Sequence, residues 1–138
     1  HSRENVRAVF IANGLTMTWD DAHSYGEKTI RIFDRKIQWQ YRLTPKKAMN
    51  SCQHVLQILI ADGKHETRFQ QEKHQRIRMD FGGETFFLQC GEAEASVISK
   101  NRSFLSVSGV GSLAYITIRR DIAANVAIEW TTELVINR

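Results

Sequence analysis

The stretch Thr44–Gly63, TPKKAMNSCQHVLQILIADG, decides the fold class expected for this chain. Thr44 suits a helix N-cap, and Pro45 suits the first helical position because its missing N–H would have no partner there. Gly63 can adopt the left-handed conformation that ends a helix. The apolar side chains that share one face at helical spacing are Ala48, Met49, Cys52, Val55, Leu56, Leu59 and Ile60. The pattern predicts an amphipathic helix that directs Cys52 into a core.

A β-hairpin is predicted immediately before this helix. Its strands are Thr29–Phe33 and Lys36–Leu43, with the turn at Asp34 and Arg35. Apolar and polar residues alternate along the second strand, which indicates one buried face and one wet face. The apolar positions are Ile37, Trp39, Tyr41 and Leu43. This apolar face is the natural partner for the stripe of the helix.

A second hairpin is predicted around Gly82 and Gly83, since a two-residue Gly-Gly turn is typical of tight β-hairpins. Its strands are Arg76–Phe81 and Glu84–Cys90. The turn pairs Phe81 with Glu84, Met79 with Phe86, and Ile77 with Leu88. Continuing the register places Cys90 opposite Gln75.

The remaining chain completes the expected architecture. A short helical pattern opens at Ser2–Asn5 with Val6, Val9 and Phe10 directed inward. Three further strand candidates are Ser103–Ser108, Leu113–Arg119 and Val126–Ile136. The last has a period of two, which indicates one inward face made up of Val126, Ile128, Trp130, Thr132, Leu134 and Ile136. The order predicts an α+β fold, an antiparallel sheet with an N-terminal helix and a central helix packed on it. A length of 138 residues predicts a single globular domain spanning 1–138.

Composition narrows the class of protein. Apolar residues make up 42% of the chain and charged residues 25%, as in ordinary globular proteins. No run approaches the roughly 18 apolar residues of a membrane span. The chain starts at His1 rather than Met, so we expect an N-terminal signal or anchor to be missing. The net charge of +4 fits a nucleic-acid partner, an anionic surface or no particular partner.

A basic run is the one candidate contact surface for nucleic acid. It consists of Arg68, Lys73, Arg76 and Arg78, with Phe69 and Phe81 available to stack on bases. Glu66, Glu72 and Asp80 are interspersed as counter-charges. We therefore expect a solvated face, with a small basic nucleic-acid-binding domain as the alternative function.

Other candidate sites have simpler interpretations. His65, Glu66 and His74 could ligate a metal, but the cationic flanks favour a solvated face. Asp20 and Asp21 could supply a carboxylate, with His23 nearby as a base, but a turn is the more frequent role of such a segment. His54 falls on the polar side of the helix and is expected to be exposed. No catalytic motif occurs, so we expect a protein that is not an enzyme and has no cofactor or metal.

Two segments resemble the globular domain of type IV pilins, in particular the type IVb subgroup. The first is Ala12–Leu15 followed by Ser24–Gly26, which is similar to the end of the long pilin helix and the loop ahead of the sheet. The second is Tyr41–Ala48 leading to Cys52, Val55 and Leu56, which is similar to a strand running into the cysteine-bearing helix.

The resemblance implies a structural role. Cys52 and Cys90 are the two cysteines of the chain, and without the resemblance they could be paired or be two buried thiols. In pilins a second cysteine near the end of the sheet closes a disulfide, which implies a Cys52–Cys90 bridge. The implied function is an extracytoplasmic structural or adhesive subunit, a pilin or minor pilin. It would assemble with other pilin-like subunits or contact a host surface, and meet the membrane only through the missing N-terminal helix.

Overall fold

The computed structural model describes residues 5–73, 75–91, 94–98, 104–106 and 109–137, and these ranges contain twelve strands and no helix. The strands are β1 (Arg7–Ile11), β2 (Gly14–Asp20), β3 (Ser24–Phe33), β4 (Lys36–Pro45), β5 (Met49–Ala61), β6 (Arg68–Lys73), β7 (Arg76–Phe81), β8 (Glu84–Gln89), β9 (Glu94–Ile98), β10 (Phe104–Ser106), β11 (Gly109–Ile122) and β12 (Ile128–Asn137). Across the same ranges, no helix has the length and apolarity needed to cross a membrane. The expected α+β fold is therefore wrong.

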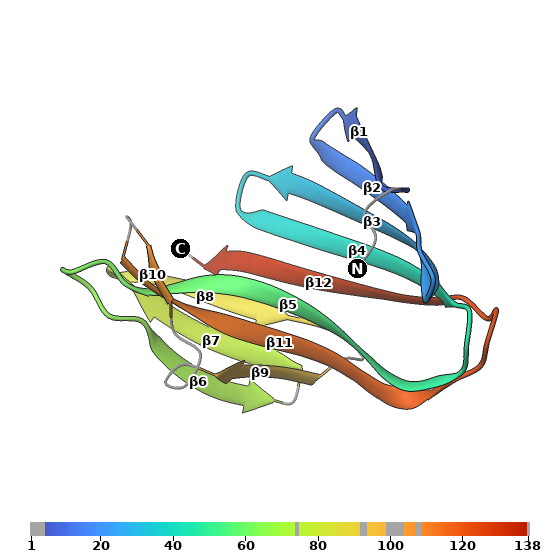
Figure 1. Cartoon of the computed structure of the whole chain (residues 1–138). Coiled ribbons are helices and arrows are strands. Elements are labelled where there is room, and N and C mark those ends of the chain that lie inside the picture. The colour runs from blue at the N-terminus through green and yellow to red at the C-terminus, as the bar shows by residue number, and fades with distance from the viewer. Residues whose placement is uncertain (1–4, 74, 92–93, 99–103, 107–108, 138) are drawn as a thin grey trace.

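The strands form two antiparallel sheets. The larger sheet has eight strands in the order β1-β2-β3-β4-β12-β8-β7-β6. The smaller has the order β10-β11-β5, with β9 also paired to β11. Figure 1 shows β5, β11 and β9 running alongside β12, β8 and β7, while β1 to β4 extend beyond them. The architecture is a two-layer β-sandwich in which the larger sheet continues past the smaller one.

The core lies between the two sheets. Its buried members are Ile77, Met79 and Leu88 of the larger sheet and Cys90, which directly follows β8, and Ile118 of β11 closes it from the smaller sheet. Leu56 of β5 and Leu134 of β12 pack against this cluster. Each layer buries the apolar half of an alternating pattern, which is how a sandwich of antiparallel sheets excludes water.

The predicted central helix is the strand β5. Cys52, His54 and Leu56 face inward, whereas Ser51 and Val55 are exposed, so the period of burial is two and not 3.6. Antiparallel pairing with β11 runs along nearly the whole strand, with Val55 opposite Tyr115. The apolar run that begins at Val55, interrupted at Gln57, is compatible with either element, and β11 supplies the hydrogen-bonding partner that favours the strand.

The residues expected to cap the helix have other roles in the structure. Thr44 and Pro45 end β4, paired with Tyr25 and Ser24. The Pro45 carbonyl accepts a hydrogen bond from the Asn125 N–H at 2.7 Å, which ties together two of the connections between the sheets. Gly63 does adopt a positive φ of 87°, but in the turn that follows β5.

The N-terminal helix is also absent from the described residues. Residues 1–4, where the predicted helix begins, lie outside the described ranges. The rest of the pattern belongs to β1, which pairs with β2 through register partners such as Val9 and Thr16. Phe10, expected to point inward, is 88% exposed.

Both predicted hairpins are confirmed. Phe33 pairs with Lys36 across the first turn. The Gly82–Gly83 turn has positive φ at both glycines, and the pairs Phe81–Glu84, Met79–Phe86 and Ile77–Leu88 are those expected. The Cys90 N–H donates to the Gln75 carbonyl at 3.0 Å, as the continued register predicts. A single domain over residues 1–138 stays a prediction.

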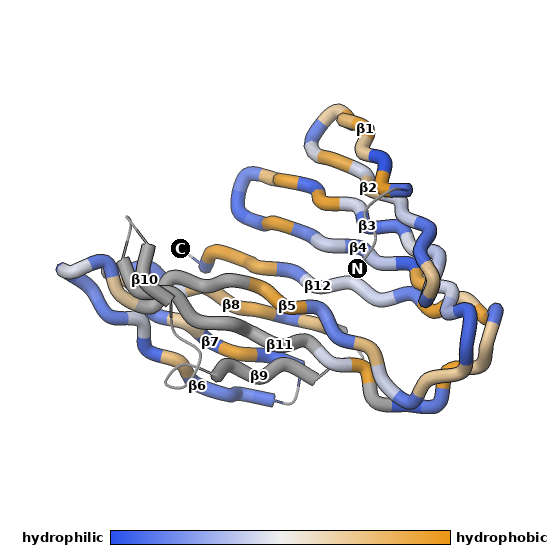
Figure 2. The backbone as a smooth tube through the Cα atoms, in the orientation of Figure 1, coloured by the Kyte–Doolittle hydropathy of each residue, from blue (hydrophilic) through white to orange (hydrophobic). Residues whose placement is uncertain are grey.

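The part of the larger sheet beyond the smaller sheet has apolar residues on its inner face. In Figure 2, hydrophobic positions interrupt hydrophilic ones along β2, β3 and β4. Leu15, Ile30 and Trp39 are neighbours in one cross-strand row, and all three are only partly buried. The inner face of the larger sheet is therefore divided into a covered half and a half that is open.

Candidate ligand-binding groove

A groove of about 690 Å³ lies at the boundary between these two halves. Strands β2, β3, β4 and β12 supply its floor, and β5 supplies one wall. The floor contains one cross-strand row, in register Met17–Lys28–Tyr41–Trp130. We call this feature the aromatic groove and define it by Trp19, Lys28, Tyr41, His54 and Trp130, all of which line it.

Three of these side chains form a ring cluster. The rings of Tyr41 and Trp130 are stacked, with centroids 4.7 Å apart and planes 8° from parallel. The His54 ring lies 4.5 Å from that of Tyr41 and is tilted by 53°. The stacking follows from the direct pairing of Tyr41 and Trp130 on adjacent strands, and His54 reaches the pair from β5 of the smaller sheet.

The cluster carries three unsatisfied polar atoms. Tyr41 Oη, His54 Nδ1 and Trp130 Nε1 are buried and have no hydrogen-bond partner among the described residues. Buried polar atoms are almost always hydrogen-bonded, and each one left unpaired costs on the order of 1–3 kcal/mol. Three such atoms therefore lie together in side chains that line the groove, which is a concentration of unused hydrogen-bonding capacity.

Trp19 forms the end of the groove on β2. Its indole lies across Gly26, and its Nε1 donates to Ser24 Oγ at 3.1 Å. The turn that follows is held by Asp21, whose Oδ1 accepts the backbone N–H groups of His23 at 2.7 Å and Ser24 at 2.9 Å. Those hydrogen bonds, led by that from His23, lower the pKa of Asp21.

The charge state of the groove follows from burial. Burial lowers the pKa of Lys28, whose Nζ lies 5.5 Å from the centroid of the Tyr41 ring. Burial, followed by the charge of Lys28, lowers the pKa of His54 to about 3. Burial also raises the pKa of Tyr41. At neutral pH the groove therefore presents neutral imidazole and phenol groups beside one ammonium group.

Sequence reasoning missed this site. His54 was expected to be exposed, but it is 8% exposed and central to the cluster. Tyr41 and Trp130 were expected on inward faces, yet nothing in their local patterns indicates that they are neighbours. The acid–base hypothesis for Asp21 and His23 is not supported, because the Asp21 carboxylate accepts hydrogen bonds from backbone N–H groups and stabilises the turn.

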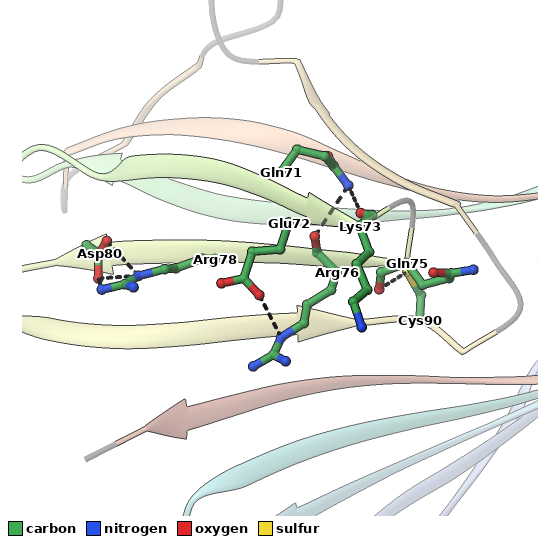
Figure 3. Close-up of polar contacts among 8 residues, drawn as sticks. All are labelled: Gln71, Glu72, Lys73, Gln75, Arg76, Arg78, Asp80 and Cys90. Atoms are coloured by element: carbon green, nitrogen blue, oxygen red, sulfur yellow. Dashed lines mark hydrogen bonds and ion pairs between the residues drawn. The ribbon is translucent and has the colours of Figure 1, made fainter.

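The predicted basic run lies on β6 and β7, away from the groove. Figure 3 shows Arg76 paired with Glu72 and Arg78 paired with Asp80, at 3.3 Å and 3.1 Å. Arg68 is exposed and stands opposite Asp80 in the register, and Lys73 is exposed at the end of β6. Two of the expected counter-charges thus engage the two arginines of β7.

The predicted disulfide is absent. Cys52 and Cys90 are both free thiols. Cys90 is fully buried in the core, where its Sγ contacts the Gln75 carbonyl at 3.2 Å, while Cys52 is partly buried on β5 and lines the groove. Burial raises the pKa of Cys90 to about 11. The pairing implied by the pilin resemblance is therefore wrong.

The metal hypothesis finds no support in the part of the chain that the structure describes, where no cluster of metal-ligating side chains occurs. His65 instead contacts Asp62, with Nδ1 3.0 Å from Oδ2. Glu66 forms an isolated β-bridge with Ala61. His74 lies outside the described residues.

Comparisons with known proteins identify the fold. No family model matches the sequence, and no curated protein matches it. Among solved structures, a candidate aldose 1-epimerase from Escherichia coli K12 superposes with a TM-score of 0.68 at 6% identity, over 96% of this chain and 68% of that one. A 4-alpha-glucanotransferase from Thermococcus litoralis superposes with a TM-score of 0.59 at 12% identity, over 94% of this chain and 22% of that one.

These likenesses show the fold and overturn the pilin interpretation. The chain shares its β-sandwich architecture with the matched parts of those two proteins, and at such identities nothing finer is shown. The resemblance to type IV pilins rested on a helix carrying Cys52, and that segment is a strand. The predicted structural or adhesive role in a pilus is therefore wrong.

Proposed function

We propose that this chain is a non-catalytic carbohydrate-binding domain whose ligand occupies the aromatic groove. One observation carries the proposal: the unpaired polar atoms of Tyr41, His54 and Trp130 lie together in a stacked cluster that lines a groove of about 690 Å³. Ligand sites are typically concave, mostly apolar or aromatic, and equipped with a few convergent polar groups.

A sugar fits this chemistry better than an apolar ligand. A pyranose ring presents a face of C–H bonds that packs on aromatic rings, and its hydroxyl groups both donate and accept hydrogen bonds. Tyr41 Oη can donate or accept, Trp130 Nε1 can donate, and neutral His54 Nδ1 can do either according to its tautomer. An apolar ligand would cover these atoms and leave them unpaired at the same cost.

The fold supports the proposal by analogy. The two superposed proteins are described as a candidate aldose 1-epimerase and a 4-alpha-glucanotransferase. Fold does not imply function, so this likeness raises the expectation of a sugar ligand without identifying one. The extracytoplasmic location expected from the sequence stays a prediction.

Binding is favoured over catalysis by the state of the titratable groups. A general acid or base works best with a pKa near the operating pH. His54 has its pKa lowered to about 3, and the Asp21 carboxylate has its pKa lowered by backbone hydrogen bonds. Both are weak proton acceptors at neutral pH, which suits recognition of a sugar rather than proton transfer.

Isothermal titration with neutral and acidic gluco-, galacto- and manno-configured oligosaccharides tests the proposal, with tryptophan fluorescence as a second readout. We expect millimolar or tighter binding of at least one sugar. Tyr41→Phe removes only Oη and should weaken that binding about two- to tenfold, the value of one hydrogen bond. The matched control is Tyr25→Phe, because Tyr25 is exposed and does not line the groove.

Tyr41→Phe also separates binding from folding. Deleting an unpaired buried hydroxyl should leave stability unchanged or raise it, so weaker binding cannot be assigned to unfolding. The proposal is wrong if no saccharide of the panel binds, or if a sugar binds equally well to the wild type and to both Tyr41→Phe and His54→Phe.

A further inference from the structure

Lys28 is placed where a ligand in the groove would meet it. It occupies the centre of β3, between Met17 of β2 and Tyr41 of β4 in the cross-strand row. It lines the groove, and its Nζ lies over the face of the Tyr41 ring. The Tyr41 ring therefore has an indole on the β12 side and an ammonium group on the β3 side.

The charge of Lys28 is uncompensated. Within the described ranges, the lysine and arginine residues in ion pairs are Lys36, Arg42, Lys46, Arg76 and Arg78, and Lys28 is not among them. Its neighbours in the row are methionine and tyrosine, so the register offers it no carboxylate. A partly buried cation without a carboxylate partner loses hydration, and the ring face of Tyr41 is the contact that partly offsets this loss, which agrees with the lowered pKa of Lys28.

Among the described residues that line the groove, Asp21 is the one carboxylate, and it does not compensate Lys28. Asp21 Oδ1 is held by the N–H groups of His23 and Ser24 and makes no ion pair with Lys28. Lys46, beside the same turn, is already paired with Asp20 at 2.6 Å. An anionic group that entered the groove over Tyr41 would therefore meet an unopposed ammonium group.

We propose that the ligand of the aromatic groove is an acidic saccharide whose carboxylate or sulfate pairs with Lys28 Nζ. This inference rests on the proposed function and specifies the class of its ligand. A charge-assisted hydrogen bond between an ammonium and a carboxylate is stronger than one between neutral groups, and more so where water is partly excluded. The sugar ring would remain on the aromatic floor while its acidic substituent points toward β3.

The test uses matched pairs of ligands that differ in charge and by a single methyl group per acidic residue. Oligomers of glucuronate, galacturonate and mannuronate are titrated beside their neutral methyl esters, and the corresponding sugar 6-sulfates distinguish sulfate from carboxylate. We expect one acid to bind about tenfold more tightly than its ester, a ratio equal to about 1.4 kcal/mol. The preference should shrink as salt is raised.

Variants at Lys28 test whether this residue causes the preference for the acid over its ester. Lys28→Met keeps an unbranched chain without charge and should reduce the acid-to-ester ratio to about one, while Lys28→Arg should retain it. Lys47→Met is the matched control, because Lys47 is exposed in the connection between β4 and β5 and lies outside the groove.

The outcomes separate the two proposals. Equal binding of acid and ester by the wild type overturns the acidic-ligand proposal and leaves carbohydrate binding intact. A preference for the acid that survives in Lys28→Met overturns the role of Lys28. Failure of every neutral and acidic sugar to bind overturns the proposed function itself, and this inference falls with it.

Discussion

The indole of Trp19 occupies the space that a side chain on Gly26 would need. An ideal Cβ on Gly26 would lie 1.8 Å from Cζ2 and 2.0 Å from Cε2 of Trp19. These two residues are direct register partners on β2 and β3. The absence of a side chain at Gly26 is thus what lets Trp19 lie flat against the sheet and close the end of the aromatic groove.

The first prediction concerns this close approach. Gly26→Ala should displace the Trp19 ring and destabilise the fold by about 1–3 kcal/mol, because overpacking forces side chains out of their preferred positions. Urea melts measure the loss, and near-ultraviolet circular dichroism reports the changed tryptophan environment. In a Trp19→Ala background the same substitution should cost much less, since the clashing ring is gone. An equal cost in both backgrounds would contradict the packing described here.

The second prediction concerns pH. Burial lowers the pKa of His54 from its ordinary value of 6.5 to about 3 in the folded chain, so between these values the unfolded chain binds a proton that the folded chain does not. Stability should therefore fall as pH decreases from about 6.5 toward 3. Carboxylates with lowered pKa values, such as Asp21, change the free energy of unfolding mainly below about pH 4. The change in stability between about pH 4 and 6.5 therefore reports on His54.

His54→Phe isolates this contribution. The variant keeps a ring on β5 but cannot take up a proton, so its stability should be nearly constant between about pH 4.5 and 6.5. Denaturant melts across this range provide the measurement. A slope that is unchanged in the variant would mean that His54 is exposed to water in solution.

The third prediction distinguishes a strand from a helix at residues 49–61. A helix would bury both Val55 and Leu56 on one stripe, whereas β5 directs Leu56 into the core and leaves Val55 43% exposed. Leu56→Ala should cost about 2–5 kcal/mol through lost burial and the cavity left behind. Val55→Ala, the matched control, should cost about 0.5 kcal/mol, the usual size for a surface position. Similar large costs at both positions would favour the helix.

The fourth prediction concerns the cysteines. Protein prepared without reductant and then denatured should show two titratable thiols, because Cys52 and Cys90 are both free. In the folded state Cys90 should react slowly, since it is fully buried and its pKa is raised to about 11. Fewer than two thiols after denaturation would indicate a bridge that the structure does not contain.

The strands that the sequence predicted correctly are those with local signals. The Gly82–Gly83 turn brings β7 and β8 together within six residues on either side, so adjacent residues alone set the register. In the same way, the alternation from Ile128 to Ile136 correctly indicates a strand with one inward face. Such patterns act over a few residues, and a sequence displays them directly.

The groove could not be predicted in this manner. Tyr41 and Trp130 become neighbours because β12 inserts between β4 and β8, a pairing between segments almost ninety residues apart. His54 forms part of the wall over these residues. Its position on a strand could not be predicted, because the sequence around it also fits a helix. No local pattern states which strand lies beside which.

The amino-acid sequence by itself determined the turns, the alternation of apolar residues, and the inward faces of Tyr41 and Trp130. The tertiary structure alone decided that Met49–Ala61 is a strand, because its amphipathic run fits either element and β11, more than forty residues later, provides the partner that fills its backbone hydrogen bonds. The tertiary structure also decided which polar atoms stay unpaired, since that depends on every element packed around them.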